Sequence, residues 1–164
     1  ATTLGNHPPD NPIGTVGCAL SVAANLINFY NAASSSSVRT DPLRLNTAFI
    51  ARHGYNMIDD VDWRQVPRFT AARLEAQPIL NVGPGTTRED LIARIDANIH
   101  LGLPVVVQGE HPPAGSKDWH FMLVVGKCAG GFIVADPAAP NGRRIYDPNE
   151  PNLRLRGIRE YVPR

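Results

Sequence analysis

The chain has 164 residues, of which 43% are hydrophobic and 19% charged, as in an ordinary globular protein with a buried core. Sixteen Lys and Arg stand against fifteen Asp and Glu, and the net charge of +1 indicates neither a nucleic-acid-binding surface nor an acidic tail. No apolar run approaches the roughly 20 residues of a membrane span, and the polar, proline-containing start does not resemble a secretory signal.

The sequence predicts a single domain, because neither an internal repeat nor a linker divides residues 1–164. The chain begins with alanine rather than methionine. We therefore expect a domain that was processed or excised from a longer protein, and the segment itself does not indicate where that parent protein resides.

Two helices are predicted in the first third of the chain. Residues 1–16 contain three prolines and are expected to be extended. Over 18–30 the apolar residues recur at three- and four-residue steps, which is typical of a packed helix. Asp41 is a good N-cap and Pro42 fits the first helical position, so a second helix is expected from there to a stop at Gly54.

The pattern then changes from helix to strand. A short helical turn is expected near 61–69, and Thr86 with Glu89 fits a capping box for a third helix that ends at Gly102. Strands are predicted over 104–108, 119–126, 131–136, 143–146 and within 154–162. We therefore expect an α+β fold, in which N-terminal helices pack on a C-terminal antiparallel sheet.

Three residues in these elements have the chemistry of a nucleophilic hydrolase. Cys18 begins the first helix, and a helix N-terminus and a nearby imidazolium both lower a thiol pKa from about 8.5. His120 lies in an apolar strand expected to be buried on both faces, where a polar ring needs a specific partner. Asp136 ends the next strand, where its carboxylate could fix the imidazole tautomer. We predict that Cys18 is the nucleophile, His120 the general base and Asp136 the acid that orients the imidazole.

Each of these residues also has an ordinary structural explanation. Cys18 could be a small buried hydrophobe, His120 a core histidine with its hydrogen bonds satisfied, and Asp136 a turn-initiating Asp-Pro. A disulfide between Cys18 and Cys128 is a further alternative to a buried strand-end thiol at Cys128. His111 is expected to be a solvated loop residue. We favour catalysis because the three residue types occur together.

Blocks of sequence around these residues match a known pattern. In chain order they are the helix start Gly17-Cys18-Ala19, the strand Pro104-Val105-Val106-Val107, His120-Phe121 and the ending Asp136-Pro137-Ala138. Over about residues 12–138 their order and spacing resemble the C39-like cysteine peptidases. The resemblance implies a papain-like fold, a central helix that starts at the cysteine, and the same three catalytic roles.

Other site residues are less clearly marked. Members of that family usually carry a glutamine upstream of the cysteine as a side-chain oxyanion donor, and none precedes Cys18 here. Asn11 or Asn6 could supply an amide instead, and we expect Asn11 to do so. Gln108 and Trp119 are candidate substrate contacts, and Gln108 has a structural role as its alternative. Neither a phosphate-binding glycine loop nor a zinc motif occurs, so no metal and no cofactor are expected.

The predicted function is that of a cysteine endopeptidase, which acts on a protein or peptide substrate through an acyl-enzyme. The resemblance implies cleavage after paired small residues, often Gly-Gly. We expect the effector module of a bacterial polymorphic toxin, secreted or delivered to act in a target-cell cytoplasm, with a cognate immunity protein that occludes its cleft. The alternatives are a papain-like glutamine deamidase or transglutaminase-type effector, which shares the acyl-enzyme chemistry, and a non-catalytic binding module.

Overall fold

The computed structural model describes residues 17–56, 60–115 and 118–164. The chain forms two compact units: unit 1 runs to Ala76 and includes Pro163 and Arg164, and unit 2 is Gln77–Val162. The elements are mixed, with helices and antiparallel strands, so the predicted α+β class is confirmed. None of the described helices combines the length and the apolar composition needed to cross a bilayer.

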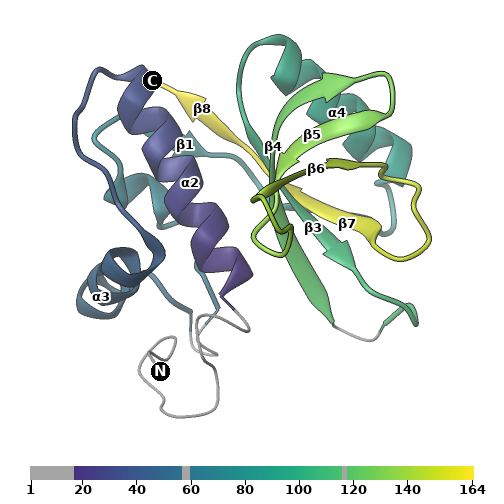
Figure 1. The fold of residues 1–164 in the computed structure, drawn as a ribbon, viewed down its shortest axis with the longest axis horizontal. Coiled ribbons are helices and arrows are strands. Elements are labelled where there is room, and N and C mark those ends of the chain that lie inside the picture. The colour runs from purple at the N-terminus through teal and green to yellow at the C-terminus, as the bar shows by residue number, and fades with distance from the viewer. Residues whose placement is uncertain (1–16, 57–59, 116–117) are drawn as a thin grey trace. The chain divides into compact units, whose positions relative to one another are not determined.

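Unit 1 is built around the helix α2 (Cys18–Ala33), which extends three residues beyond the predicted 18–30 (Figure 1). Leu20, Val22 and Leu26 on this helix are fully buried. Buried residues occur on most sides of α2, as the small alanines between them allow. A 3-10 helix, η1 (Val66–Phe69), confirms the short helical turn expected near 61–69.

The second helix, α3 (Pro42–Arg52), begins where its cap predicts and ends one residue earlier than its glycine suggests. The Asp41 carboxylate accepts a hydrogen bond from the Arg44 backbone N–H at 2.8 Å. His53, rather than Gly54, adopts the left-handed conformation that terminates the helix, with φ of 55°. Gly54 has a different role, because a Cβ at that position would collide with the Phe49 ring.

Asparagine side chains tie α2 to the rest of unit 1. Asn31 is fully buried, and its side chain accepts from the Ala71 backbone N–H at 2.7 Å and donates to the Val38 carbonyl at 3.1 Å. Asn28 exchanges two hydrogen bonds with the backbone of Thr40, each 2.8 Å long. These bonds fix the loop after α2, which the serine run predicts, against the helix that carries Cys18.

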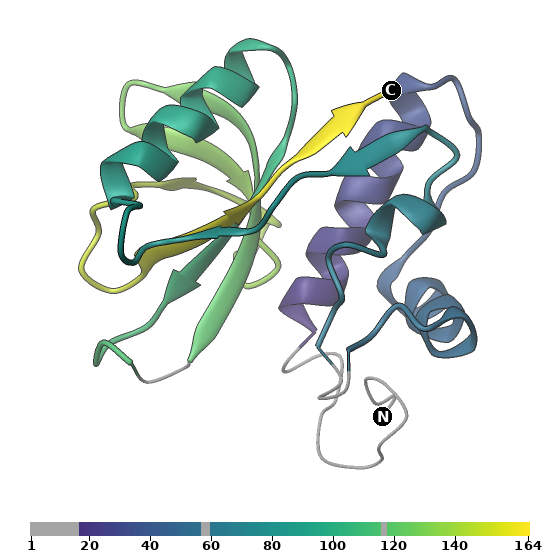
Figure 2. The same ribbon diagram turned by 180° about the vertical axis from the view of Figure 1, so that it is seen from behind.

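Unit 2 contains an antiparallel six-stranded sheet with the strand order β2-β7-β3-β4-β5-β6. The helix α4 (Arg88–His100) lies across one face of this sheet (Figure 2) and buries Leu91 and Ile95 against it. The strands are β2 (Leu80–Asn81), β3 (Val105–Glu110), β4 (Trp119–Cys128), β5 (Gly131–Ala135), β6 (Arg143–Tyr146) and β7 (Arg154–Arg159). A second, two-stranded sheet pairs β1 (Leu74–Ala76) with β8 (Tyr161–Pro163).

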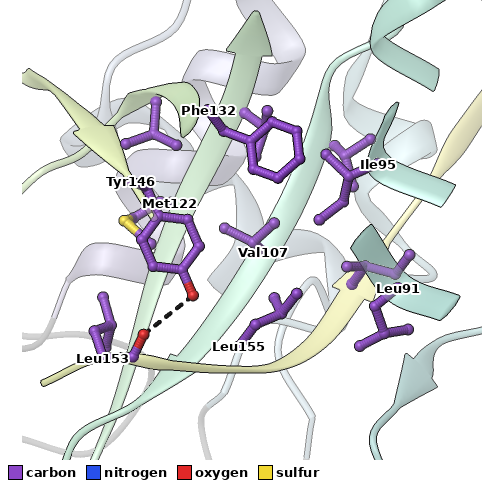
Figure 3. Packing of buried hydrophobic residues seen from close by; sticks show 12 residues of the cluster. Leu91, Ile95, Val107, Met122, Phe132, Tyr146, Leu153 and Leu155 are labelled. Atoms are coloured by element: carbon purple, nitrogen blue, oxygen red, sulfur yellow. Dashed lines mark hydrogen bonds between the residues drawn. The ribbon is translucent and has the colours of Figure 1, made fainter. Parts of the chain in front are cut away.

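The core of unit 2 lies between α4 and the sheet (Figure 3). Val107 on β3 pairs with Met122 on β4, and both are fully buried in this cluster. The phenol of Tyr146 donates to the Leu153 carbonyl at 3.1 Å, which satisfies the one polar group of that side chain inside the core. Side chains alternate along a strand, so His120, two residues before Met122, belongs to the same face of β4.

Two details of β4 correct the sequence analysis. The pairing of β4 with β5 shifts register between Val124 and Gly126, and Val125 at this irregularity is exposed. The apolar composition of the strand suggests burial on both faces along its whole length. The structure shows that this burial is interrupted at Val125. Cys128 at the end of β4 is half-buried, not the buried thiol that was expected.

The start of α4 gives a first testable prediction. Thr87 and Asp90, not the expected Thr86 and Glu89, form the capping box: the Thr87 hydroxyl accepts from the Asp90 N–H at 3.1 Å, and the Asp90 carboxylate accepts from the Thr87 N–H at 2.7 Å. Thr87→Ala should lower the free energy of unfolding by about 1 kcal/mol, measured by urea denaturation. Thr86→Ala, the matched control, should change it by less than about 0.5 kcal/mol, and the opposite order would contradict this cap.

Candidate catalytic site

Cys18 is the first residue of α2. Its N-cap, Gly17, has φ and ψ of −82° and 18° and makes no side-chain capping hydrogen bond. The first turn of α2, described in full, contains no acidic residue. The positive end of the helix dipole therefore acts on the half-buried Cys18 without an acidic side chain in that turn to offset it, a setting that favours the thiolate. Neither Cys18 nor Cys128 is in a disulfide.

The expected oxyanion donors, Asn11 and its alternative Asn6, lie outside the described residues. Their part in the site therefore stays a prediction. The backbone N–H of Cys18 belongs to the first turn of α2, where amides have no intrahelical acceptor.

Within unit 2, the structure brings His120 and Asp136 together. The His120 Nε2 atom lies 2.6 Å from Asp136 Oδ1, and the two side chains are only 12% and 4% exposed. His120 is the second residue of β4, opposite Gly109 on β3. Asp136 directly follows β5, which is the other neighbour of β4 in the sheet. The pairing expected from adjacent antiparallel strands is therefore confirmed for these two side chains.

The hydrogen bonds of Asp136 fix its charge. Burial alone would raise the pKa of this carboxyl, but hydrogen bonds from His120, Arg144 and Ala138 outweigh it and hold the pKa well below the ordinary value. The Ala138 N–H donates to Oδ1 at 2.9 Å and Arg144 Nε donates to Oδ2 at 2.6 Å. An ionised Asp136 can only accept, so Nε2 of His120 carries the hydrogen and Nδ1 of the neutral ring is the basic nitrogen.

Arg144 is a site residue that the sequence analysis missed. It lies on β6 opposite Val134, two residues before Asp136, and its Nη1 is 3.2 Å from Glu150 Oε1. Counting the register back across the turn between β5 and β6 would have placed Arg144 near Asp136. The predicted strand limits give the length of that turn but not the pairing register across it, and this register brings Arg144 to Asp136.

His111 lies nearer to the site than expected for a solvated loop residue. Its ring centroid is 6.3 Å from that of His120, and its Nδ1 is 2.9 Å from the Asn152 carbonyl oxygen. The residue is half-buried and lies in the loop after β3, so it keeps part of its exposure to solvent. His111 is thus a second imidazole beside His120, and it supplies a matched control for substitutions there.

The two candidate substrate contacts differ in their surroundings. Gln108 is fully buried, and its Oε1 accepts a hydrogen bond of 2.6 Å from Arg159 Nη2. Burial lowers the pKa of Arg159 to about 10, so this guanidinium remains charged at neutral pH. The bond gives Gln108 a structural role, whereas Trp119, at the start of β4, is 47% exposed. Contact of either residue with substrate stays a prediction.

Acid should weaken unit 2 through Asp136. Because the pKa of this carboxyl is depressed in the folded protein, its contribution to stability is complete above the unfolded pKa of about 3.9 and is lost as the pH falls below it. Urea denaturation at a series of pH values should show this loss in the wild type and a smaller one in Asp136→Asn. Parallel losses in the two proteins would contradict the assignment.

No protein-family model, curated protein or solved structure matches the chain. Among the described residues, no group of three or more His, Cys, Asp and Glu side chains is arranged to hold a metal ion. Function is therefore inferred from the chemistry of the side chains themselves, of which the His120–Asp136 pair and the helix start at Cys18 are the most specific.

Proposed function

We propose that the protein is a cysteine endopeptidase of papain-like fold with Cys18, His120 and Asp136 as its catalytic triad. The observation that carries the proposal is the buried 2.6 Å contact between His120 Nε2 and Asp136 Oδ1. An ionised carboxylate in that position holds the imidazole in one tautomer and stabilises the imidazolium that forms during acyl transfer. Catalysis requires the Cys18 Sγ to come within hydrogen-bond reach of His120 Nδ1.

The first half of the reaction forms an acyl-enzyme. His120 Nδ1 takes the proton from Cys18 Sγ, and the thiolate attacks the carbonyl carbon of the peptide bond. The backbone N–H of Cys18, in the first turn of α2, donates to the oxyanion that develops. The imidazolium then gives its proton to the leaving amine as the C–N bond breaks, and the acyl group remains on the sulfur.

The second half returns the enzyme to its starting state. His120 Nδ1 takes a proton from a water molecule, which attacks the thioester carbon. When the tetrahedral intermediate collapses, the C–S bond breaks, the imidazolium returns its proton to the sulfur, and the new carboxylic acid leaves and loses its remaining proton to solvent. Throughout the cycle Asp136 stays ionised, because its three hydrogen-bond donors stabilise the negative charge.

The resemblance to C39-like peptidases supports a finer assignment. It favours a protein substrate cut after paired small residues such as Gly-Gly. It also agrees with the effector module of a bacterial polymorphic toxin, whose cognate immunity protein would block the site.

The experiment that tests the function is terminal proteomics of a susceptible bacterial lysate treated with the protein. Wild type and the control Cys128→Ala should generate the same discrete new protein termini, and Cys18→Ala should generate none. A mass increase of about one dalton at glutamines without new termini would replace peptidase by deamidase. Identical lysates after all three treatments would contradict catalysis and favour a binding module.

A further inference from the structure

We propose that Arg144, held in turn by Glu150, is the positioning residue that keeps the Asp136 carboxylate aimed at His120 and limits how strongly it attracts the imidazole proton. In its consequences for catalysis this inference rests on the proposed function. Its structural part concerns only residues of unit 2 and does not depend on the substrate.

Both oxygen atoms of the Asp136 carboxylate accept hydrogen bonds. Oδ1 accepts from His120 at 2.6 Å and from the Ala138 N–H at 2.9 Å, while Oδ2 accepts from Arg144 Nε at 2.6 Å. A rotation that turned Oδ1 away from the imidazole would therefore break the Arg144 contact too. Charge-assisted hydrogen bonds of this length are the strong ones, so Arg144 opposes any rotamer that abandons His120.

Arg144 is itself held in place by contacts with Glu150 and with two core residues. Its Nη1 and Nη2 atoms both lie 3.2 Å from Glu150 Oε1, and Nη2 lies 3.4 Å from the Met122 sulfur. The guanidinium carbon is 5.4 Å from the ring centroid of Tyr146. Met122 and Tyr146 both belong to the buried cluster of Figure 3, so the arginine side chain packs against the hydrophobic core of unit 2. Its planar fork contacts the two carboxylates through different nitrogen atoms, an arrangement that the single ammonium nitrogen of a lysine does not reproduce.

The charged side chains of this network lie in a defined order. Protonated His120, Asp136, Arg144 and Glu150 form a row in which cation and anion alternate. Arg144 competes with the imidazolium for the same carboxylate, and Glu150 partly offsets that competition. Removing the arginine should therefore make His120 easier to protonate, and neutralising Glu150 should make it harder.

Other ionisable groups near His120 do not change in these substitutions. His111 lies beside it, and Asp118 lies two residues before it in the chain, just ahead of β4. On β3, Glu110 accepts from the Gly115 N–H at 2.9 Å and lies 3.4 Å from Arg156. These groups are constant across the variants. Differences between variants therefore report on Arg144 and Glu150 alone.

The test is a histidine NMR titration of the full chain, with the His120 signal identified by its loss in His120→Gln. In Arg144→Met the pH at which half of the His120 rings are protonated should rise by about one pH unit. In Glu150→Gln it should fall, and in Arg144→Lys it should stay near the wild-type value. The His111 signal serves as the internal control and should move less than that of His120.

Activity supplies a second readout. On a peptide cleaved by the wild type, Arg144→Met should lower kcat at least tenfold with little change in KM, and Arg144→Lys should recover only part of it. If His120 titrates at the same pH in both Arg144→Met and Glu150→Gln, or moves in the same direction in both, the inference is overturned. Should Arg144→Met fail to fold, the Glu150→Gln and Arg144→Lys titrations decide.

The two proposals fail in different ways. If His120 titrates as expected but the wild type cuts nothing, the peptidase assignment is lost and the positioning role stands. If the wild type is an active peptidase and His120 does not respond to Arg144 or Glu150, the positioning role is lost and the peptidase stands.

Discussion

His120→Gln is expected to lower peptide-bond hydrolysis by about ten-thousand-fold. Glutamine can still contact Asp136, but it has no atom that takes a proton from a thiol near neutral pH. The site would keep its shape and lose its base. The measurement is kcat/KM on a peptide whose cleavage by the wild type has been established, with unfolding by urea as a check on the fold.

His111→Gln is the matched control for this prediction. It removes the neighbouring imidazole, whose ring centroid lies 6.3 Å from that of His120 and whose Nδ1 lies 2.9 Å from the Asn152 carbonyl oxygen. Activity should stay within about threefold of the wild type, because His111 takes no proton in the proposed cycle. Equal losses in the two variants, or an active His120→Gln, would contradict the assignment of His120 as the base.

Asp136→Ala should lower the free energy of unfolding by about 3 kcal/mol, the cost of removing one partner from a buried charge cluster. The substitution leaves His120 Nε2, Arg144 Nε and the Ala138 N–H without their common acceptor. It should also abolish hydrolysis. The measurement is urea denaturation near neutral pH, with wild type and variant compared in the same buffer.

Asp136→Asn separates shape from charge at this position. Its amide oxygen can still accept one or two of the three hydrogen bonds, so it should cost less stability than Asp136→Ala. It cannot balance both an imidazolium and the Arg144 guanidinium, so hydrolysis should still fall by at least about a hundredfold. A cost of less than about 1 kcal/mol for Asp136→Ala would show that this cluster does not hold unit 2 together.

The helices could be predicted where the signal is local. Asp41 with Pro42 places the start of α3 correctly, because an N-cap acts over a few neighbouring residues. At α4 the chain offers two adjacent capping pairs with the same spacing, Thr86 with Glu89 and Thr87 with Asp90. Local chemistry cannot choose between them, and the structure uses the second.

The strands show the same division between local and long-range information. The range 143–146 is predicted to the residue, because it is bounded by turn signals on both sides. The strands β1 and β2, with three and two residues, are too short for alternation to reveal. The predicted strand within 154–162 divides into β7 and β8 at Glu160, whose carboxylate binds Arg94 on α4 at 2.9 Å.

The candidate site could be predicted in its residue types but not in its supports. His120 is predicted because a polar ring in an apolar strand needs a specific partner, and Asp136 because it ends the next strand, where its carboxylate could fix the imidazole tautomer. Arg144 and Glu150 are not predicted, since their place depends on the register of β6 and on the chain beyond it. Such support comes from tertiary pairing, which no short sequence window contains.

The central claim is that His120 activates Cys18, and competitive alkylation of the two cysteines tests it most directly. Cys128 is half-buried like Cys18 and serves as an internal reference thiol. With iodoacetamide at pH 6 and mass spectrometry of the labelled peptides, Cys18 should react about a hundredfold faster than Cys128. In His120→Ala this advantage should fall to about tenfold or less, with the reactivity of Cys128 unchanged. Equal reactivity of the two thiols in the wild type, or an advantage of Cys18 that survives the loss of His120, would contradict the account.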